Sequence, residues 1–145
     1  ACQQRNASAR QLRDRFISEK SSSLFALKAF WEGFDASGDT LRCVVIPKLP
    51  FSSPTDPLSC ERGRREERAW AQYALPEAVL EVKQAAGRLI RSSSDVGVLV
   101  LADSRLVTKG YGKKFLNSLP TSGYQRIESG NVGRYLELWR RAHER

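Results

Sequence analysis

Short, almost wholly apolar segments alternate with segments of helical periodicity along this chain, and this alternation limits the fold more than any other feature. The apolar segments are residues 24–27, 41–46 and 96–101. Strands that are apolar on both faces are typical of parallel sheets, because helices cover both sides of those sheets. The sequence therefore predicts an α/β fold in which a parallel sheet has helices on both faces.

Helical periodicity marks the segments around these strands. The clearest helix is predicted over residues 75–92, with Pro76 in its first turn, where proline is favoured. Residues 49–57 hold three prolines and predict a stiff extended connection. Further helices are predicted over residues 8–19, 61–73, 107–119 and 132–142.

The charge balance favours a polyanionic partner. The 145 residues include 24 Lys and Arg against 16 Asp and Glu, which gives a formal net charge of +8 and suits nucleic acid or nucleotide phosphates. Residues 61–68 concentrate arginines and glutamates, and we interpret them as a solvated helix face with internal ion pairs. No apolar run approaches the roughly 18 to 20 residues of a membrane-spanning helix, so no membrane partner is predicted.

The number and positions of the cysteine, histidine and methionine residues predict whether the chain binds a metal, which compartment it occupies and whether it is part of a longer protein. Cys2, Cys43 and Cys60 are far apart, and the single histidine is His143, so no metal site is predicted in this chain. An odd number of cysteines favours a reducing compartment, and we expect a cytoplasmic protein. The chain has no methionine and begins at Ala1, which predicts a piece of a longer protein.

The helix over residues 75–92 is predicted to carry a polar stripe opposite its apolar one. At about 100° per residue, Gln84, Arg88 and Arg91 fall within about 60° of one another, while the apolar residues gather on the other side. Gly87 lies among them and predicts close approach of another group to the helix backbone. Two guanidinium groups one turn apart, aimed the same way, suit a multiply charged phosphate group.

Spacing alone leaves a second interpretation of this stripe open. In it, the helix is an ordinary amphipathic one whose arginines pair with Glu77 and Glu81 on the same face. The order of the residues favours the phosphate interpretation, because that order resembles a known signature.

Residues 84–91, Gln-Ala-Ala-Gly-Arg-Leu-Ile-Arg, resemble the QxxGRxxR signature of motif VI in superfamily 2 helicases, which lies in their second RecA-like motor domain. Residues 30–35, FWEGFD, are similar to motif V of the XPD/DinG family, and residues 48–57 are similar to the stretch that follows it in bacterial DinG-like proteins. The D-x-R and Y-G positions of that family match Asp103, Arg105, Tyr111 and Gly112. Because these motifs stand in the family's order over residues 24–120, the chain is identified as a member of the XPD/DinG helicases.

The resemblance implies a domain organisation. Residues 1–120 would form an N-terminally truncated second RecA-like helicase domain, α/β with a parallel sheet and helices on both faces. Beyond the match, periodicity predicts that residues 121–145 form a loop and an amphipathic helix docked on the same domain, with Trp139 largely buried.

The resemblance also implies an activity. The full-length protein would be an ATP-dependent DNA helicase, an ATP hydrolase of DNA repair, whose partners are single-stranded DNA and the first RecA-like domain of the same protein. That first domain would mainly hold the ATP and its Mg²⁺, since this chain contains no GxxxxGK[ST] phosphate loop. The 145-residue piece is therefore expected to hydrolyse no ATP on its own.

Each matched residue carries an implied role. Arg88 and Arg91 would act as arginine fingers in the interdomain ATP site, and Gln84 would contact the γ-phosphate or the attacking water. The nucleotide-binding residues would be Glu32, Gly33, Asp35 and Gly87. Phosphates of single-stranded DNA would be contacted by Lys28, Ser52 and Ser53.

Two other classes of function stay open at this point. A stand-alone basic nucleic-acid-binding module without ATPase function would rely on the net charge and on residues 62–68, and its binding would depend on salt but not on nucleotide. A regulatory or protein-docking domain would use the helix over residues 132–142 as its contact. A phosphate loop in the sequence upstream of Ala1 would favour the helicase over both.

Overall fold

The computed structural model describes residues 2–3, 8–26, 40–90, 95–121 and 123–143. In chain order, the strands are β1 (Cys2–Gln3), β2 (Leu24–Phe25), β3 (Cys43–Ile46) and β4 (Val98–Leu101). The helices are α1 (Ala9–Ser18), α3 (Pro57–Arg65), η2 (Trp70–Ala74), α4 (Leu75–Leu89), α5 (Arg105–Thr108), α6 (Gly112–Ser118), η3 (Ser129–Asn131) and α7 (Val132–Ala142). None of the helices in these described ranges is long and apolar enough to span a membrane.

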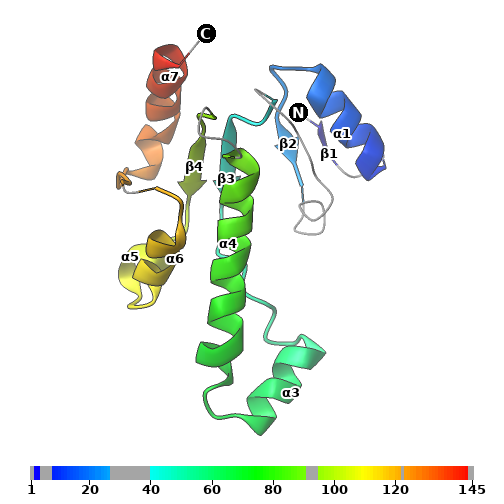
Figure 1. Ribbon diagram of the computed structural model, residues 1–145, viewed down its shortest axis with the longest axis vertical. Helices are drawn as coiled ribbons and strands as arrows, with labels where there is room; N and C mark the ends of the chain where they lie inside the picture. The colour runs from blue at the N-terminus through cyan, green and yellow to red at the C-terminus, as the bar shows by residue number, and fades with distance from the viewer. Residues whose placement is uncertain (1, 4–7, 27–39, 91–94, 122, 144–145) are drawn as a thin grey trace.

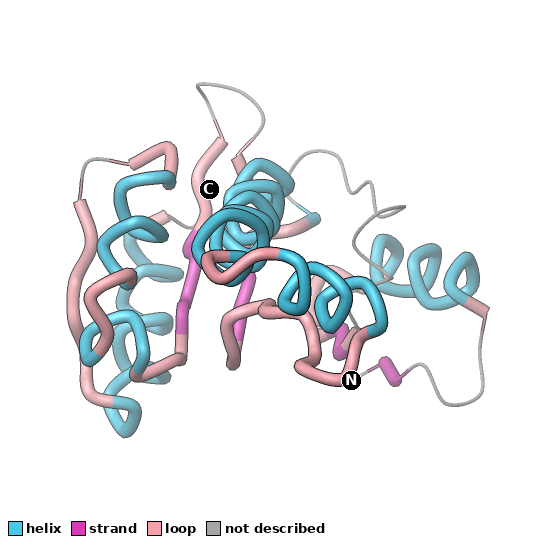
Figure 2. The backbone as a smooth tube through the Cα atoms, turned by 90° about the horizontal axis from the view of Figure 1, so that it is seen from below, coloured by secondary structure: helices cyan, strands magenta, loops and turns pink. Residues whose placement is uncertain are grey.

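The strands form parallel pairs. β3 pairs with β4 in a register that sets Cys43 opposite Val98 and Ile46 opposite Leu101, while β1 pairs with β2. The described residues thus contain two separate two-stranded sheets. Both views place β1, β2 and α1 on one side of α4, and α5, α6 and α7 on the other (Figure 1, Figure 2). The prediction of parallel strands is confirmed, whereas a single sheet with helices on both faces is not seen in the described part of the chain.

Helix α4 provides one wall of the hydrophobic core. Four residues of the predicted apolar stripe are buried, and Val79 is partly buried. Val82 is fully buried in one cluster with Phe115, Leu49 and Leu106. Ala78 and Ala85, at the edge of the stripe, are buried as well. The helix ends at Leu89 rather than at the predicted residue 92, because Ile90 adopts an extended backbone with φ −118° and ψ 108°. Because α4 ends before residue 91, helical periodicity does not place Arg91 on the polar stripe, and Arg91 lies outside the described residues.

A π-helical turn precedes α4. The single helix predicted over residues 61–73 is in fact α3, which ends at Arg65, followed by η2, which runs directly into α4. Pro76 accounts for the wide turn, since it has no N–H to donate to the Gln72 carbonyl and its ring would clash with that carbonyl in a regular α-helix. The Leu75 N–H donates instead to the Trp70 carbonyl, five residues back.

The segment predicted as one helix over residues 107–119 is also two helices, α5 and α6. Gly112 opens α6 at a position where a Cβ atom would overlap the Leu106 carbonyl oxygen. Only glycine permits this close approach of the two backbones. The chain can therefore turn sharply between α5 and α6, and Phe115 of α6 reaches the core.

Helix α7 has the predicted bounds but is less buried than predicted. Tyr135 and Leu138 are exposed, and Trp139 is half-buried with its ring stacked on the His143 ring at 4.7 Å. The Arg42 guanidinium donates to the His143 carbonyl at 2.9 Å, which ties the end of α7 to the residue before β3. The prediction of a largely buried Trp139 is wrong, because this ring packs on the end of its own helix rather than in the core.

Candidate functional site

Half of the predicted site residues can be placed. The described ones are Gln84, Gly87, Arg88, Ser52 and Ser53. Those that lie outside the described residues are Lys28, Glu32, Gly33, Asp35 and Arg91. Two elements thus carry the described site: the C-terminal half of α4 and the loop between β3 and α3.

The last turns of α4 present a polar surface. Gln84 and Gly87 are exposed and Arg88 is half-buried, while the residues between them face the core. Apart from its chain neighbours and the backbone of its own helix, no described atom comes within 4 Å of where a Cβ would stand on Gly87. The expectation that another group packs against Gly87 is therefore not met among the described residues, none of which covers this side of α4.

The Arg88 guanidinium has no hydrogen bond or ion pair with any residue that the structure describes. Glu77, which the amphipathic interpretation offers as a partner, is bound instead by Arg62 of α3, with Nη1 and Oε1 2.5 Å apart. Pairing of the stripe with Glu77 is therefore wrong, since α3 folds beside the first turn of α4 and supplies a nearer arginine. The positive charge of Arg88 stays available on the surface of α4.

Ion pairs account for part of the arginine-rich run over residues 61–68. Arg65 pairs with Glu61, one turn earlier in α3, at 2.7 Å. Arg62 pairs with Glu77 and also lies 4.6 Å from the centre of the Tyr73 ring. The interpretation of this run as a face with internal ion pairs is confirmed for Arg65, whereas Arg62 pairs outside the run, with Glu77 of α4. Both pairs leave fewer of its cations for a polyanion.

The β3–α3 loop exposes the two predicted DNA-contact serines. The Ser53 hydroxyl lies 2.8 Å from the Thr55 hydroxyl, and the Ser53 carbonyl accepts the Asp56 N–H at 2.9 Å. Asp56 in turn caps α3 by accepting the Ser59 N–H at 2.9 Å, and this bond lowers the pKa of Asp56. Ser52 and Ser53 therefore stand on a tight, hydrogen-bonded turn with exposed side chains.

The polar surface of α4 and the serine turn lie at opposite ends of the strand pair. Leu89 packs against Gly97, just before β4, so the polar surface lies near the amino ends of β3 and β4. Ser52 and Ser53 follow the carboxyl end of β3. Figure 1 shows α4 running antiparallel to both strands, in agreement with this placement. Among the described residues, the structure therefore does not bring the predicted nucleotide-facing group (Gln84, Gly87 and Arg88) together with the DNA-facing Ser52 and Ser53.

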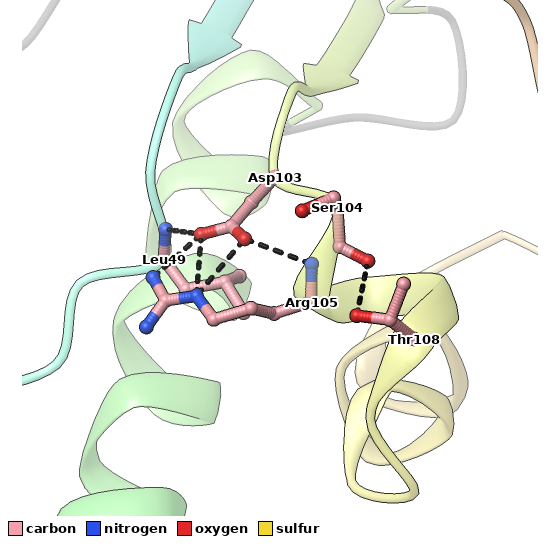
Figure 3. Close-up of polar contacts among 5 residues, drawn as sticks. All are labelled: Leu49, Asp103, Ser104, Arg105 and Thr108. Atoms are coloured by element: carbon pink, nitrogen blue, oxygen red, sulfur yellow. Dashed lines mark hydrogen bonds and ion pairs between the residues drawn. The ribbon is translucent and has the colours of Figure 1, made fainter.

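Asp103 joins the carboxyl ends of β3 and β4 (Figure 3). Its side chain is 8% exposed and accepts the Leu49 N–H at 2.8 Å and the Arg105 N–H at 3.0 Å. The Arg105 guanidinium also donates to it, through Nε at 3.0 Å and Nη2 at 2.6 Å. The Arg105 side chain above all, with the two backbone donors, holds the pKa of Asp103 well below its usual range. Asp103 is thus a charged anchor at neutral pH.

This network fixes the start of the serine turn. Leu49 is buried in the core, and the Arg105 guanidinium lies 5.2 Å from the centre of the Phe51 ring. Phe51 directly precedes the serines, so Asp103 and Arg105 act as positioning residues for the loop. Sequence reasoning matched these two residues to a family pattern but gave them no role. The signal that could have found one is an acidic residue just past a buried strand, followed two residues later by arginine.

The described residues form no metal-binding cluster. Across the ranges that the structure covers, no group of three or more His, Cys, Asp or Glu side chains could hold a metal ion. Cys43 and Cys60 are free thiols, and partial burial raises the pKa of Cys43. Guanidinium, amide and hydroxyl groups make up the candidate surfaces, and these are donors that suit phosphate oxygens.

Comparison with known proteins supplies relatives for most of the chain. Residues 1–122 match the family profile of the helicase C-terminal domain. The ATP-dependent DNA helicase YoaA of Escherichia coli (strain K12) is 48% identical over 114 residues, which cover 76% of this chain and 18% of that protein. The 3'-5' exonuclease DinG of Bacillus subtilis (strain 168) is 38% identical over 130 residues, or 87% of this chain and 14% of that protein. The ATP-dependent DNA helicase DinG of Photobacterium profundum is 38% identical over 120 residues, or 80% and 17%.

Proposed function

Because the chain belongs to the helicase C-terminal domain family, with relatives named YoaA and DinG, we propose that it is the second RecA-like motor domain of an ATP-dependent DNA helicase. The membership confirms the resemblance to DinG/XPD-like helicases that the motifs indicate. The chain spans less than a fifth of the length of these relatives, so the activity of the full-length protein is part of the proposal.

The observation that carries the proposal is the polar surface at the end of α4. Arg88 has no hydrogen-bond or ion-pair partner among the described residues, and none of them fills the space in front of Gly87. In an isolated domain, an unpaired half-buried arginine and a glycine inside a helix both lower stability. A second domain that packs over the glycine can bring a phosphate group to the arginine. This surface therefore suits an interdomain nucleotide site.

In the proposed reaction, water attacks the γ-phosphorus of ATP and the bond to the bridging oxygen breaks, which releases ADP and phosphate. Arg88 and Arg91 would stabilise the charge on the transferring group and the leaving oxygen, and Gln84 would hold the γ-phosphate or the attacking water. Arginine fingers are worth a factor of about 10³ to 10⁵ in related hydrolases. The first RecA-like domain would hold the Mg²⁺, which neutralises phosphate charge, and the present chain alone would hydrolyse no ATP.

The remaining predicted residues divide between nucleotide and DNA. Glu32, Gly33 and Asp35 would line the nucleotide from motif V. Lys28, Ser52 and Ser53 would contact phosphates of single-stranded DNA, and the Asp103–Arg105 pair holds the serine turn in place for that contact. Nucleotide and DNA would then meet this domain at opposite ends of the β3–β4 pair.

The test is ATP hydrolysis by the full-length protein at saturating single-stranded DNA. Arg88→Ala should lower the rate at least about a hundredfold and leave the melting temperature within about 2 °C, because the side chain makes no hydrogen bond or ion pair with a described residue. Lys83→Ala is the matched control: Lys83 is an exposed cation on the same helix, outside the polar stripe, and its loss should leave the rate unchanged. Near-normal turnover of Arg88→Ala would contradict the finger assignment.

The stand-alone nucleic-acid-binding module is the less supported alternative. It depends on the arginines of residues 62–68, and two of these are already paired with Glu61 and Glu77. DNA binding that varies with salt but that ATP and its analogues leave unchanged, in a full-length protein without ATPase activity, would favour this module.

A further inference from the structure

Four aromatic rings form a cluster at the carboxyl edge of the β3–β4 pair, where the β3–α3 loop, η2 and α6 meet. Trp70 stacks on Phe51, with centroids 5.8 Å apart and planes 28° apart, and lies 5.1 Å from Tyr111. Phe115 contacts Phe51 from the core side at 5.9 Å and is fully buried. Trp70, by contrast, is 48% exposed. Phe115 therefore forms the buried side of the cluster, and Trp70 forms its exposed side.

The position of Trp70 is held firmly. It opens the π-helical turn that Pro76 makes necessary, and its carbonyl accepts the Leu75 N–H. Two further rings contact its indole, and one of them, Phe51, is itself covered by the Arg105 guanidinium. An indole that is already ordered loses little conformational entropy when a flat ligand stacks on it.

The charges around this ring favour an anionic ligand. Lys109, Lys113 and Lys114 stand within three residues of Tyr111, and all three are exposed. Lys48, three residues before Phe51, is exposed as well. Within four residues of a ring of the cluster, the acidic residues are Glu66, which accepts the Tyr73 hydroxyl at 2.7 Å, and the exposed Glu67. Asp103 is bound by the Arg105 that covers Phe51.

We propose that Trp70, backed by Phe51 and Tyr111, is a stacking platform for a base of single-stranded DNA, with Lys109, Lys113 and Lys114 binding the adjoining phosphates. An ordered aromatic ring beside a group of lysines is the combination that single-stranded nucleic acid requires, because every base has a flat face and every linkage a charge. Ser52 and Ser53 directly follow Phe51, so the platform extends the predicted serine contact into one surface. This inference rests on the proposed function and adds to it the residues that bind the bases.

A second protein surface is the competing occupant of this platform. An apolar partner would bury the indole equally well, but it would have to desolvate or pair the flanking lysines. Charge complementarity therefore favours DNA, and shielding of Trp70 in the absence of DNA becomes an outcome of the test.

The test measures binding of fluorescein-labelled oligothymidylate to the full-length protein by fluorescence anisotropy, over a series of salt concentrations. Trp70→Ala should raise the Kd about tenfold at every salt concentration, since loss of stacking releases no counterions. Trp70→Phe should restore most of the affinity. Lys113→Ala should weaken binding and also reduce the dependence of log Kd on log salt by about 0.7, the value for one phosphate contact on a single strand. Tyr124→Ala, which removes an exposed aromatic ring of the 123–128 connection, is the matched control and should bind like the parent.

A second measurement needs no substitution and so avoids any loss of folding. Oligonucleotides with 5-bromouracil, irradiated in complex with the parent protein, should crosslink to the peptide that contains Trp70. Parent-like affinity of Trp70→Ala, absence of that crosslink, or protection of Trp70 from acrylamide in the DNA-free protein would each overturn the platform. If the parent itself binds no oligothymidylate, the proposed helicase function fails as well; if the parent binds DNA and hydrolyses ATP normally while Trp70→Ala changes nothing, only the platform fails.

Discussion

At the scale of single residues, Asp103 has the clearest energetic role. Its carboxylate accepts two backbone N–H groups and a guanidinium, and most of it is shielded from water. Asp103→Asn keeps the shape but removes the charge, so it should lower the free energy of unfolding by about 2 kcal/mol at pH 7, the usual worth of hydrogen bonds to a charged group.

The pH dependence of this effect has a definite sign. Because the folded state depresses the pKa of Asp103, the stabilisation is present above the pKa of an unfolded aspartate, about 3.9, and is lost as the pH falls below about 4. Urea unfolding at pH 7 and pH 3 checks this: the difference between parent and Asp103→Asn should shrink at the lower pH. An equal difference at both pH values would show that charge does not carry the effect.

Sequence reasoning at this scale succeeded where periodicity alone decides exposure. Gln84 is exposed and Val82 buried, as the angular positions on a helix predict. It gave Asp103 no role, because the Leu49 N–H that binds it comes from a segment 54 residues away. The stacking of Trp70 on Phe51 also depends on residues far apart in the sequence, so no local sequence pattern predicts it.

At the scale of elements, glycines decide where helices can pack. Gly112→Ala would drive a Cβ into the Leu106 carbonyl, and backbone atoms at the α5–α6 junction cannot move aside cheaply. We expect it to lower the free energy of unfolding by about 3 kcal/mol. Gly63→Ala in α3 is the matched control: nothing lies within 4 Å of its Cβ position, so better helix propensity should stabilise the protein by up to about 1 kcal/mol. Thermal melting of both variants checks the pair, and equal destabilisation would contradict the packing argument.

The bounds of elements were predictable where local chemistry sets them. α1 and α7 fall within a residue of their predicted ends, because a capping serine at Ser8 and a regular apolar period define them. The segments over residues 61–73 and 107–119 were each predicted as one helix, but each is divided between two helices. The first breaks at Glu66, whose backbone is extended with φ −134° and ψ 120°, and the second breaks before Gly112, whose close approach to the Leu106 carbonyl depends on the folded chain.

At the scale of the whole molecule, the parallel arrangement of strands was predictable but the extent of the sheet was not. Strand pairs need partners from distant segments, and composition alone does not say how many residues each partner offers. The two strand pairs of the described chain are short, and α4 packs its buried face against the β3–β4 pair. Its other face carries the polar surface of the proposed nucleotide site, so α4 would connect the core of this domain to the first RecA-like domain.

Substitution of Gly87 should affect the stability of this domain and the ATPase activity of the full-length protein in opposite directions. Within the described chain nothing lies near its Cβ position, so Gly87→Ala should stabilise α4 by about 1 kcal/mol. If the first RecA-like domain closes over this glycine, the added methyl group should displace it and lower DNA-stimulated ATP hydrolysis by at least about tenfold, because misplacement by about 1 Å can cost a factor of 10². Gly133→Ala in α7, whose Cβ position is equally open, should bring a similar gain in stability with no change in rate. Melting temperatures and ATPase rates of the two variants in the full-length protein decide the matter: a Gly87→Ala protein that is both more stable and fully active would mean that no second domain approaches α4 at this point.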